Sequence, residues 1–369
     1  MGAARTNSFP LFALETTAMS DEILFERRGD WGVITLNRPE ALNALNQAMC
    51  QALRPQLEAW ADDAAVKAIM VLGAGDRAFC AGGDIRWLHD TAKEDPPRAA
   101  EFFQDEYRCN AAIKHFPKPY LAVIDGVTMG GGVGLSVHGP YRIAGDNTLF
   151  AMPETGIGLF PDVGGGYFMP RLEGGLGNYL GLVGTRLKAA DCLYAGIATH
   201  YAPSEGMEAL IAALTGAALG DDAAGAIDAV LAEHARDPGE GALPAQRADI
   251  DRLFQEDSLD AVMAGLEADG GEWAQATLET LSRMSPTSMR LTFAQFQRGR
   301  TMDFDAEMKM EFRLASRVME GHDFFEGVRA QIIDKDRNPK WSPATLAEVS
   351  DAEIEAYFAD LGDRELVLP

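Results

Sequence analysis

The sequence predicts an α/β fold that continues into a mainly helical C-terminal region. Between about residues 21 and 220, β-rich segments alternate with segments of helical periodicity. Later in the chain we find Ala/Leu periodicity and no strand-like run. The 369 residues are 47% hydrophobic, so the chain can bury a large core. We predict a disordered extension over residues 1–20, an α/β core over 21–220 and an acidic helical region over 221–369 that packs on the core.

The first predicted elements are a hairpin and an amphipathic helix. Residues 23–36 form two strand-like runs separated by a polar turn, which is typical of a β-hairpin. Between Gln47 and Asp63, apolar residues recur at spacings of four, four and three, as one buried helix face requires. These residues are Met49, Leu53, Leu57 and Trp60.

Three later β-rich regions each lead into a loop that carries glycines. The pairs are 68–73 before loop 78–84, 120–124 before glycines 130–132, and the short candidates at 141–143 and 149–152 before loop 153–166. Because a glycine-bearing loop follows each of these regions, the sequence offers three loops that could contact a ligand.

The charge balance excludes some classes of partner. Lys and Arg number 32 and Asp and Glu 56, giving a formal net charge of −24. Such a charge opposes sequence-independent binding to nucleic acid or to an anionic membrane, and we predict neither partner. Residues 221–270 alone hold thirteen acidic and three basic residues, which indicates a strongly solvated helix face.

The four cysteines lie far apart and form no CxxC pair or Cys/His cluster, so we predict neither a disulfide framework nor a metal site. No window approaches eighteen consecutive apolar residues, and the first eighteen residues resemble no secretory signal. Arg5 is their only basic residue, which is untypical of a transit peptide. We therefore expect a cytoplasmic location.

The glycine loops are candidates for an oxyanion hole. Glycine at the start of a helix lets backbone N–H groups approach a ligand oxygen, and the helix dipole adds positive potential there. If a helix runs from Gly130 through Val137, one of its first N–H groups can bind a thioester or carboxyl oxygen, with a second donor from loop 81–83. Each donor would stabilise the transition state by about 3 kcal/mol. The alternative is that these glycines serve only tight turns and close helix packing.

Two acids in the third loop are candidate catalytic residues. Glu154 and Asp162 lie eight positions apart in an apolar, glycine-rich stretch with few basic neighbours. Such surroundings raise the pKa of a carboxyl group and favour acid/base or nucleophilic catalysis. Taken alone, an acid in such a position is more often a helix cap or a loop anchor.

Other motifs fail. Residues 134–139 resemble a G-x-S-x-G nucleophile elbow, but His138 stands where the second glycine is needed. A dinucleotide-binding fingerprint that starts at Gly132 fails at Val137. No histidine has a metal-ligand spacing, and we expect His138 to be a packed or capped side chain.

Three segments, in this order along the chain, resemble the crotonase (enoyl-CoA hydratase/isomerase) superfamily. They are NRPEALNAL at 37–45, FCAGGDI at 79–85 and GVTMGGG at 126–132. Four further segments resemble the hydrolases of that superfamily that cleave 3-hydroxyacyl-CoA thioesters. These are 129–139, 152–162, 285–288 and 333–341.

The resemblance implies a core built as a spiral of β-β-α turns that holds an acyl-CoA thioester. Gly83 and Gly131 match the superfamily's oxyanion-hole N–H donors. The loop that lines the coenzyme A pocket in relatives corresponds here to Ala81, Gly82, Asp84 and Ile85.

The resemblance also assigns roles to three acids. Glu154 matches the superfamily's catalytic glutamate, and Asp162 matches the second acid of the hydrolases. Together with Glu106 and Gly131, they are the expected substrate-binding residues. For Glu106 the alternative is a solvated carboxylate on a helix.

The function that the resemblance implies is hydrolysis of a short branched 3-hydroxyacyl-CoA, with 3-hydroxyisobutyryl-CoA as the expected substrate, in valine breakdown. Coenzyme A is part of the substrate, so no separate cofactor is expected. The role of Glu154 as nucleophile or general base stays open, and so does a homo-oligomer.

Two other functions stay open. One is an enoyl-CoA hydratase or isomerase, which is disfavoured because Gly134 stands where hydratases carry their first glutamate. The other is a noncatalytic or RNA-binding relative with the same fold, against which the net charge and the pair Glu154 and Asp162 argue.

Overall fold

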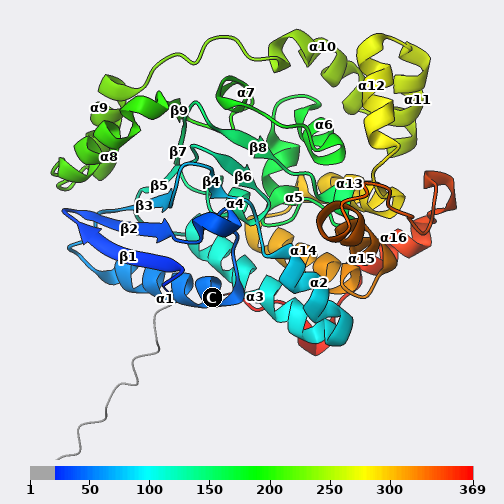
Figure 1. Cartoon of the computed structure of the whole chain (residues 1–369), viewed down its shortest axis with the longest axis horizontal. Helices are drawn as coiled ribbons and strands as arrows, with labels where there is room; N and C mark the ends of the chain where they lie inside the picture. Colours follow the sequence, from blue (N-terminus) through cyan, green and yellow to red (C-terminus); the bar gives the residue numbers. More distant parts are fainter. Residues whose placement is uncertain (1–20, 369) are drawn as a thin grey trace, which may run out of the picture.

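The computed structural model describes residues 21–368, and the predicted extension over residues 1–20 lies outside the described residues. The chain forms an α/β core with two sheets and a C-terminal helical region (Figure 1). The predicted hairpin is confirmed as the antiparallel strands β1 (Ile23–Arg28) and β2 (Trp31–Leu36).

The core is a spiral in which each turn gives one strand to each sheet. The larger sheet has the order β1-β2-β3-β5-β7-β9, with β3 Ala68–Gly73, β5 Tyr120–Val123, β7 Tyr141–Ala144 and β9 His200–Tyr201. The smaller sheet has the order β4-β6-β8, with β4 Ala78–Cys80, β6 Val127–Met129 and β8 Leu149–Ala151. Every pair except β1 with β2 is parallel, which confirms the predicted α/β class.

The helices of the core follow these strands along the chain. They are α1 Gln47–Asp62, α2 Ile85–Glu94, α3 Pro96–Lys114, α4 Gly131–Gly134, α5 Gly165–Phe168, α6 Leu176–Val183 and α7 Ala189–Tyr194. Helix α1 begins after Asn46, whose side chain accepts a hydrogen bond from the Met49 N–H. All four apolar residues predicted for its inner face are buried.

The helix predicted from Gly130 through Val137 is shorter than expected. Helix α4 covers only Gly131–Gly134, although a hydrogen bond from the Val137 N–H to the Val133 carbonyl continues the helical pattern. The chain has to leave this helix at once, because Pro140 follows and β7 starts at Tyr141.

Helices dominate the C-terminal region. They are α8 Met207–Gly216, α9 Ala223–His234, α10 Leu243–Phe254, α11 Leu259–Asp269, α12 Glu272–Leu281, α13 Pro286–Gly299, α14 Phe304–Val318, α15 His322–Val328 and α16 Asp351–Phe358. No strand follows β9 within the described part of the chain. Figure 1 shows α8 and α9 beside the larger sheet and an extended segment crossing the molecule from α9 to α10.

The hydrophobic core joins the two regions. One cluster of buried residues contains Phe102 and Tyr107 of α3 together with Phe296 of α13 and Phe312 of α14. A second cluster joins the outer face of the larger sheet to α8 and α9. Among residues 21–368, no helix is both long and apolar enough to cross a membrane.

Candidate active site

The smaller sheet brings the three glycine-bearing loops to one place. Strands β4, β6 and β8 are adjacent and parallel, so their carboxyl ends meet at one edge of the sheet. The loops after them are 81–84, 130–131 and 152–166. Ligands of α/β proteins commonly bind outside the carboxyl ends of parallel strands.

A cavity of about 180 Å³ lies at this edge. Its polar groups come from Glu106, Glu154, Asp162 and the glycines of the first two loops. The rest of its wall is mainly apolar and comes from Ala81, Ile85, Leu88, Phe102, Phe103, Met129, Pro153, Ile157, Leu159 and Ile332. Such a pocket, apolar with a few convergent polar groups, is typical of a small-molecule site.

The two amides predicted as an oxyanion hole line this cavity. Within the described residues, neither the Gly83 N–H nor the Gly131 N–H donates a hydrogen bond to another residue. The two loops are close, because a side-chain carbon placed on Gly82 would lie 3.6 Å from the Gly131 nitrogen. Gly131 is the first residue of α4, where helix N–H groups are free to bind a ligand.

Glu154 faces these loops. A side-chain carbon placed on Gly130 would lie 3.4 Å from Glu154 Oε1 and 3.4 Å from the Gly82 Cα. Glu154 is buried, and its Oε2 has no hydrogen-bond partner among the described residues. Burial, assisted by the nearby Asp162, raises the pKa of the Glu154 carboxyl well above its usual range. A carboxyl group with a raised pKa is suited to proton exchange with a bound ligand.

Asp162 completes the predicted acid pair. It is buried in the same cavity, and burial raises the pKa of its carboxyl to about 7. The Tyr107 hydroxyl donates a hydrogen bond to Asp162 Oδ2 at 2.9 Å, which limits this rise by stabilising the carboxylate. Tyr107 was not predicted as a site residue.

Glu106 is buried, so the alternative of a solvated helix carboxylate is wrong. Burial, followed by repulsion from Asp162, raises the pKa of the Glu106 carboxyl well above its usual range. A side-chain carbon on Gly131 would lie 2.3 Å from Glu106 Oε1 and 3.0 Å from Leu45 Cδ1, so a larger residue here would displace the Glu106 carboxyl. Glu106 thus lines the cavity beside Gly131, the place expected for a substrate-binding residue.

The predicted coenzyme A loop divides into two parts. Ala81, Gly82 and Ile85 line the cavity, whereas Asp84 does not. Asp84 is the N-cap of α2, where its side chain accepts a hydrogen bond from the Trp87 N–H, and it forms an ion pair with Arg38.

Gly134, the position that corresponds to the first glutamate of hydratases, has no free space beside it for a side chain. A side-chain carbon on Gly134 would lie 2.6 Å from Asn110 Nδ2 and 2.7 Å from the Val163 Cβ. No larger side chain fits there without moving α3 or the loop that carries Asp162.

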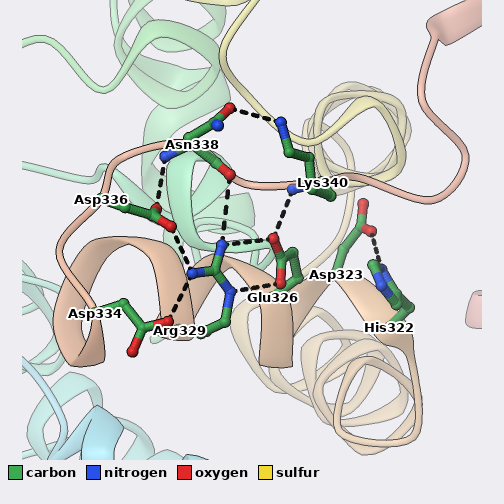
Figure 2. A network of polar contacts seen from close by, with 8 residues as sticks. All are labelled: His322, Asp323, Glu326, Arg329, Asp334, Asp336, Asn338 and Lys340. Atoms are coloured by element: carbon green, nitrogen blue, oxygen red, sulfur yellow. Dashed lines mark hydrogen bonds and ion pairs between the residues drawn. The ribbon is translucent and has the colours of Figure 1, made fainter.

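The C-terminal region contributes one wall residue, Ile332, from the short helix Arg329–Ile333 that continues α15. Arg329 holds the segment that follows, by ion pairs to Glu326, Asp334 and Asp336 (Figure 2). This partly buried apolar residue closes the cavity with a part of the chain far from the glycine loops.

The sequence analysis missed Tyr107, which binds the Asp162 carboxyl, and most of the apolar wall residues of the cavity, Ile332 among them. A signal for the first exists in α3, whose buried positions 99, 102, 103, 106, 107 and 110 follow helical spacing. That pattern would have placed Glu106 and Tyr107 on the inner face. Ile332 has no comparable local signal.

Two further predictions concern histidine and metal. His138 is packed as expected, with its Nε2 at 2.7 Å from the Val163 carbonyl oxygen and its ring against Phe304. No cluster of three or more metal-ligating side chains is found over residues 21–368.

Comparison with known proteins gives concordant matches over nearly the whole chain. The family model described as enoyl-CoA hydratase/isomerase matches residues 31–358. A curated relative from Danio rerio named 3-hydroxyisobutyryl-CoA hydrolase, mitochondrial, is 48% identical over 94% of this chain and 92% of its own. The protein of the same name from Homo sapiens is 44% identical over 95% of this chain and 92% of its own.

Two solved structures resemble the whole fold. One, described as a carnitinyl-CoA dehydratase from Mycobacterium thermoresistibile, has a TM-score of 0.88 and 38% identity, covering 94% of this chain and 99% of that one. The other, described as an enoyl-CoA hydratase from Rhodobacter sphaeroides, has a TM-score of 0.86 and 38% identity, covering 94% and 100%.

Proposed function

The chain belongs to the enoyl-CoA hydratase/isomerase family, and we propose that it hydrolyses 3-hydroxyisobutyryl-CoA to 3-hydroxyisobutyrate and coenzyme A. Relatives named for this activity are 44–48% identical to the chain over most of its length. The observation that carries the proposal is the position of Glu154, whose carboxyl faces the two glycine loops across one cavity. The enzyme is an acyl-CoA thioester hydrolase.

The amides of Gly83 and Gly131 polarise the thioester carbonyl. Both line the cavity and have no other acceptor within the described residues. Their hydrogen bonds strengthen as negative charge develops on the carbonyl oxygen, and each is worth about 3 kcal/mol in the transition state. The polarised carbonyl carbon is then open to attack from the side of Glu154.

Glu154 drives the attack by one of two routes. Its carboxylate attacks the carbonyl carbon, expels the thiolate of coenzyme A and forms an anhydride that water then opens. Alternatively, it removes a proton from a water that attacks directly. In the direct route the water oxygen ends in the product acid. In the anhydride route it ends in the product acid when water attacks the acyl carbon, or in the Glu154 carboxyl when water attacks the glutamyl carbon. In both routes one water proton ends on the coenzyme A sulfur. A single turnover in ¹⁸O-labelled water separates the routes, because only the first can leave label in the Glu154 carboxyl.

Asp162, held in place by Tyr107, recognises the 3-hydroxyl group. The Asp162 carboxyl lines the cavity and is held by the Tyr107 hydroxyl, so its remaining lone pairs can accept a hydrogen bond from the substrate. A buried acceptor left unpaired is costly, so substrates without the hydroxyl are bound less well.

Hydration of an unsaturated acyl-CoA is the rival function, and the descriptions of the two solved structures name that kind of activity. The closed space at Gly134 argues against it, because the glutamate that hydratases use has no room there. We expect thiol release from 3-hydroxyisobutyryl-CoA and no loss of the conjugated absorbance of crotonyl-CoA. Loss of that absorbance without thiol release would overturn the hydrolase assignment.

The cofactor, the location in the cell and the oligomeric state are separate proposals. No cofactor beyond the coenzyme A of the substrate is proposed. The curated animal relatives are named as mitochondrial, so cell fractionation is the test of the predicted cytoplasmic location. Sedimentation is the test of a homo-oligomer.

A further inference from the structure

We propose that two buried side chains of the C-terminal helices, Glu311 of α14 and Gln295 of α13, are positioning residues that clamp the backbone on both sides of Asp162. The inference rests on the proposed function, because hydrolysis of a 3-hydroxyacyl thioester is its readout. It assigns the C-terminal region a part in the chemistry besides closing the cavity.

The clamp consists of four hydrogen bonds. Before Asp162, Gln295 Nε2 donates to the Pro161 carbonyl at 2.9 Å. After it, Glu311 accepts from the Gly164 N–H at 2.8 Å and from the Gly166 N–H at 3.0 Å. Gln295 Nε2 also donates to Glu311 Oε1 at 3.0 Å, which joins the two sides. Gln295 and Glu311 are both fully buried, so water cannot replace these bonds.

The segment that the clamp holds contains backbone conformations that are unfavourable by themselves. Val163 has φ of +53°, a left-handed conformation that is unfavourable for a β-branched residue, and Gly164 follows with φ of +85°. Such strained conformations persist only where surrounding contacts impose them. Without the clamp, we expect residues 161–166 to relax and the Asp162 carboxyl to move from the cavity.

A second acid accompanies Glu311. Glu307 lies one turn earlier on α14 and is also fully buried. Burial raises the pKa of Glu307 to about 7, and burial with repulsion from Glu307 raises the pKa of Glu311. A side-chain carbon on Gly166 would lie 2.1 Å from Glu307 Oε1, so both acids press against the same glycine loop.

Stability alone does not account for this arrangement. Replacing buried charged groups by apolar residues of similar volume is often neutral or stabilising. Two buried carboxyl groups on one helix are therefore a poor means of holding helices together. Their contacts to the loop of a site residue give them a function that an apolar pair could not supply, because only an acceptor can bind the Gly164 and Gly166 amides.

The test is a double-mutant cycle that combines Glu311→Gln with Asp162→Asn. Gln keeps the shape of Glu311 but replaces one acceptor oxygen by a donor, which opposes a glycine N–H. We expect Glu311→Gln to lower kcat/KM for 3-hydroxyisobutyryl-CoA by about 100-fold, the size of effect that a displacement of about 1 Å produces. Because Glu311 acts through Asp162, the double variant should be no more than about threefold slower than Asp162→Asn alone.

Three measurements accompany the cycle. Ser316→Ala is the control on the same helix, because Ser316 is buried and bonds only to the Phe312 carbonyl of its own helix, so activity should be unchanged. Isobutyryl-CoA lacks the 3-hydroxyl group, and its hydrolysis should fall much less in Glu311→Gln. Thermal melting verifies that each variant is folded. Should Glu311→Gln not fold, Gln295→Met, which removes the other half of the clamp, replaces it in the cycle.

The outcomes separate the two proposals. An inactive wild-type enzyme overturns the proposed function and this inference with it. If the wild type is active and the losses from Glu311→Gln and Asp162→Asn multiply, Glu311 does not act through Asp162, and the inference alone is overturned. Equal losses on both substrates overturn it as well.

Discussion

Three carboxyl groups share the wall of one small cavity, and the charge of Asp162 affects the ionisation of the other two. Burial raises the pKa of Glu106, Glu154 and Asp162, and the charge of Asp162 raises the pKa of the other two further. Few positive side chains offset this, which agrees with the sparse basic residues around the acids in the sequence. Perturbed acids in a cleft are typical of catalytic sites.

Substitution of Asp162 tests hydroxyl recognition. We expect Asp162→Ala to lower kcat/KM more for 3-hydroxyisobutyryl-CoA than for isobutyryl-CoA, because only the first substrate offers a donor to the lost carboxylate. The measurement is thiol release with both substrates. Equal losses would refute the role of Asp162 in binding the hydroxyl group.

The raised pKa of Asp162 also predicts how stability depends on pH. Its carboxyl titrates near 3.8 in the unfolded chain and at about 7 in the folded protein, so between these values the folded state binds more protons. Stability should therefore fall as pH rises from about 4 to about 7. Urea unfolding at pH 5.5 and pH 8 measures this, and Asp162→Asn should reduce the difference. If Asp162→Asn leaves this difference in stability unchanged, the pH dependence arises from other groups.

At the scale of elements, periodicity predicted the hairpin and the buried face of α1 because both patterns are local and repeat several times. In the second sheet, β8 was predicted as the short candidate at 149–152, whereas β4 falls in the predicted loop 78–84 and β6 was not predicted. Strands of three residues are too short for a period to show. The same limit explains the overlong helix predicted after Gly130.

Because α4 packs closely against α3, we expect substitution of Gly134 to lower the stability of the fold. Gly134→Ala places a carbon 2.6 Å from Asn110 Nδ2, and overpacking of this kind costs about 1–3 kcal/mol. We expect a matching loss in the free energy of unfolding, measured in urea, with no gain of crotonyl-CoA hydration. The control is Gly216→Ala at the end of α8, where the added carbon meets no atom within 4 Å. Equal stability of the two variants would contradict the packing argument.

At the scale of the whole molecule, the acids and glycines of the site were predictable, whereas the residues of the C-terminal region that contact them were not. Glu154 and the glycine loops lie in motifs that follow successive strands, so the sequence itself places them together. Gln295 and Glu311 reach the site from more than 130 positions away, and Ile332 from still farther. Only tertiary packing brings these residues there, and no local pattern carries that information.

The joint core predicts that the spiral and the C-terminal helices unfold together. One buried cluster runs from α1 and α3 to α13, α14 and α16. We expect a single transition in urea, with intrinsic Trp fluorescence and far-UV circular dichroism giving the same midpoint. Two separated transitions would show that the C-terminal region is an independent unit, and the clamp on Asp162 would then lose its basis.

Substitution of Glu154 is the most direct test of the central claim, which is that this carboxyl cleaves a thioester polarised by two glycine amides. Glu154→Gln keeps the size of the side chain and removes its charge. Thiol release from 3-hydroxyisobutyryl-CoA should fall by about 100- to 10,000-fold, the range of acid/base catalysis, while the melting temperature is maintained or rises. Near-wild-type hydrolysis by a folded Glu154→Gln enzyme would contradict the account.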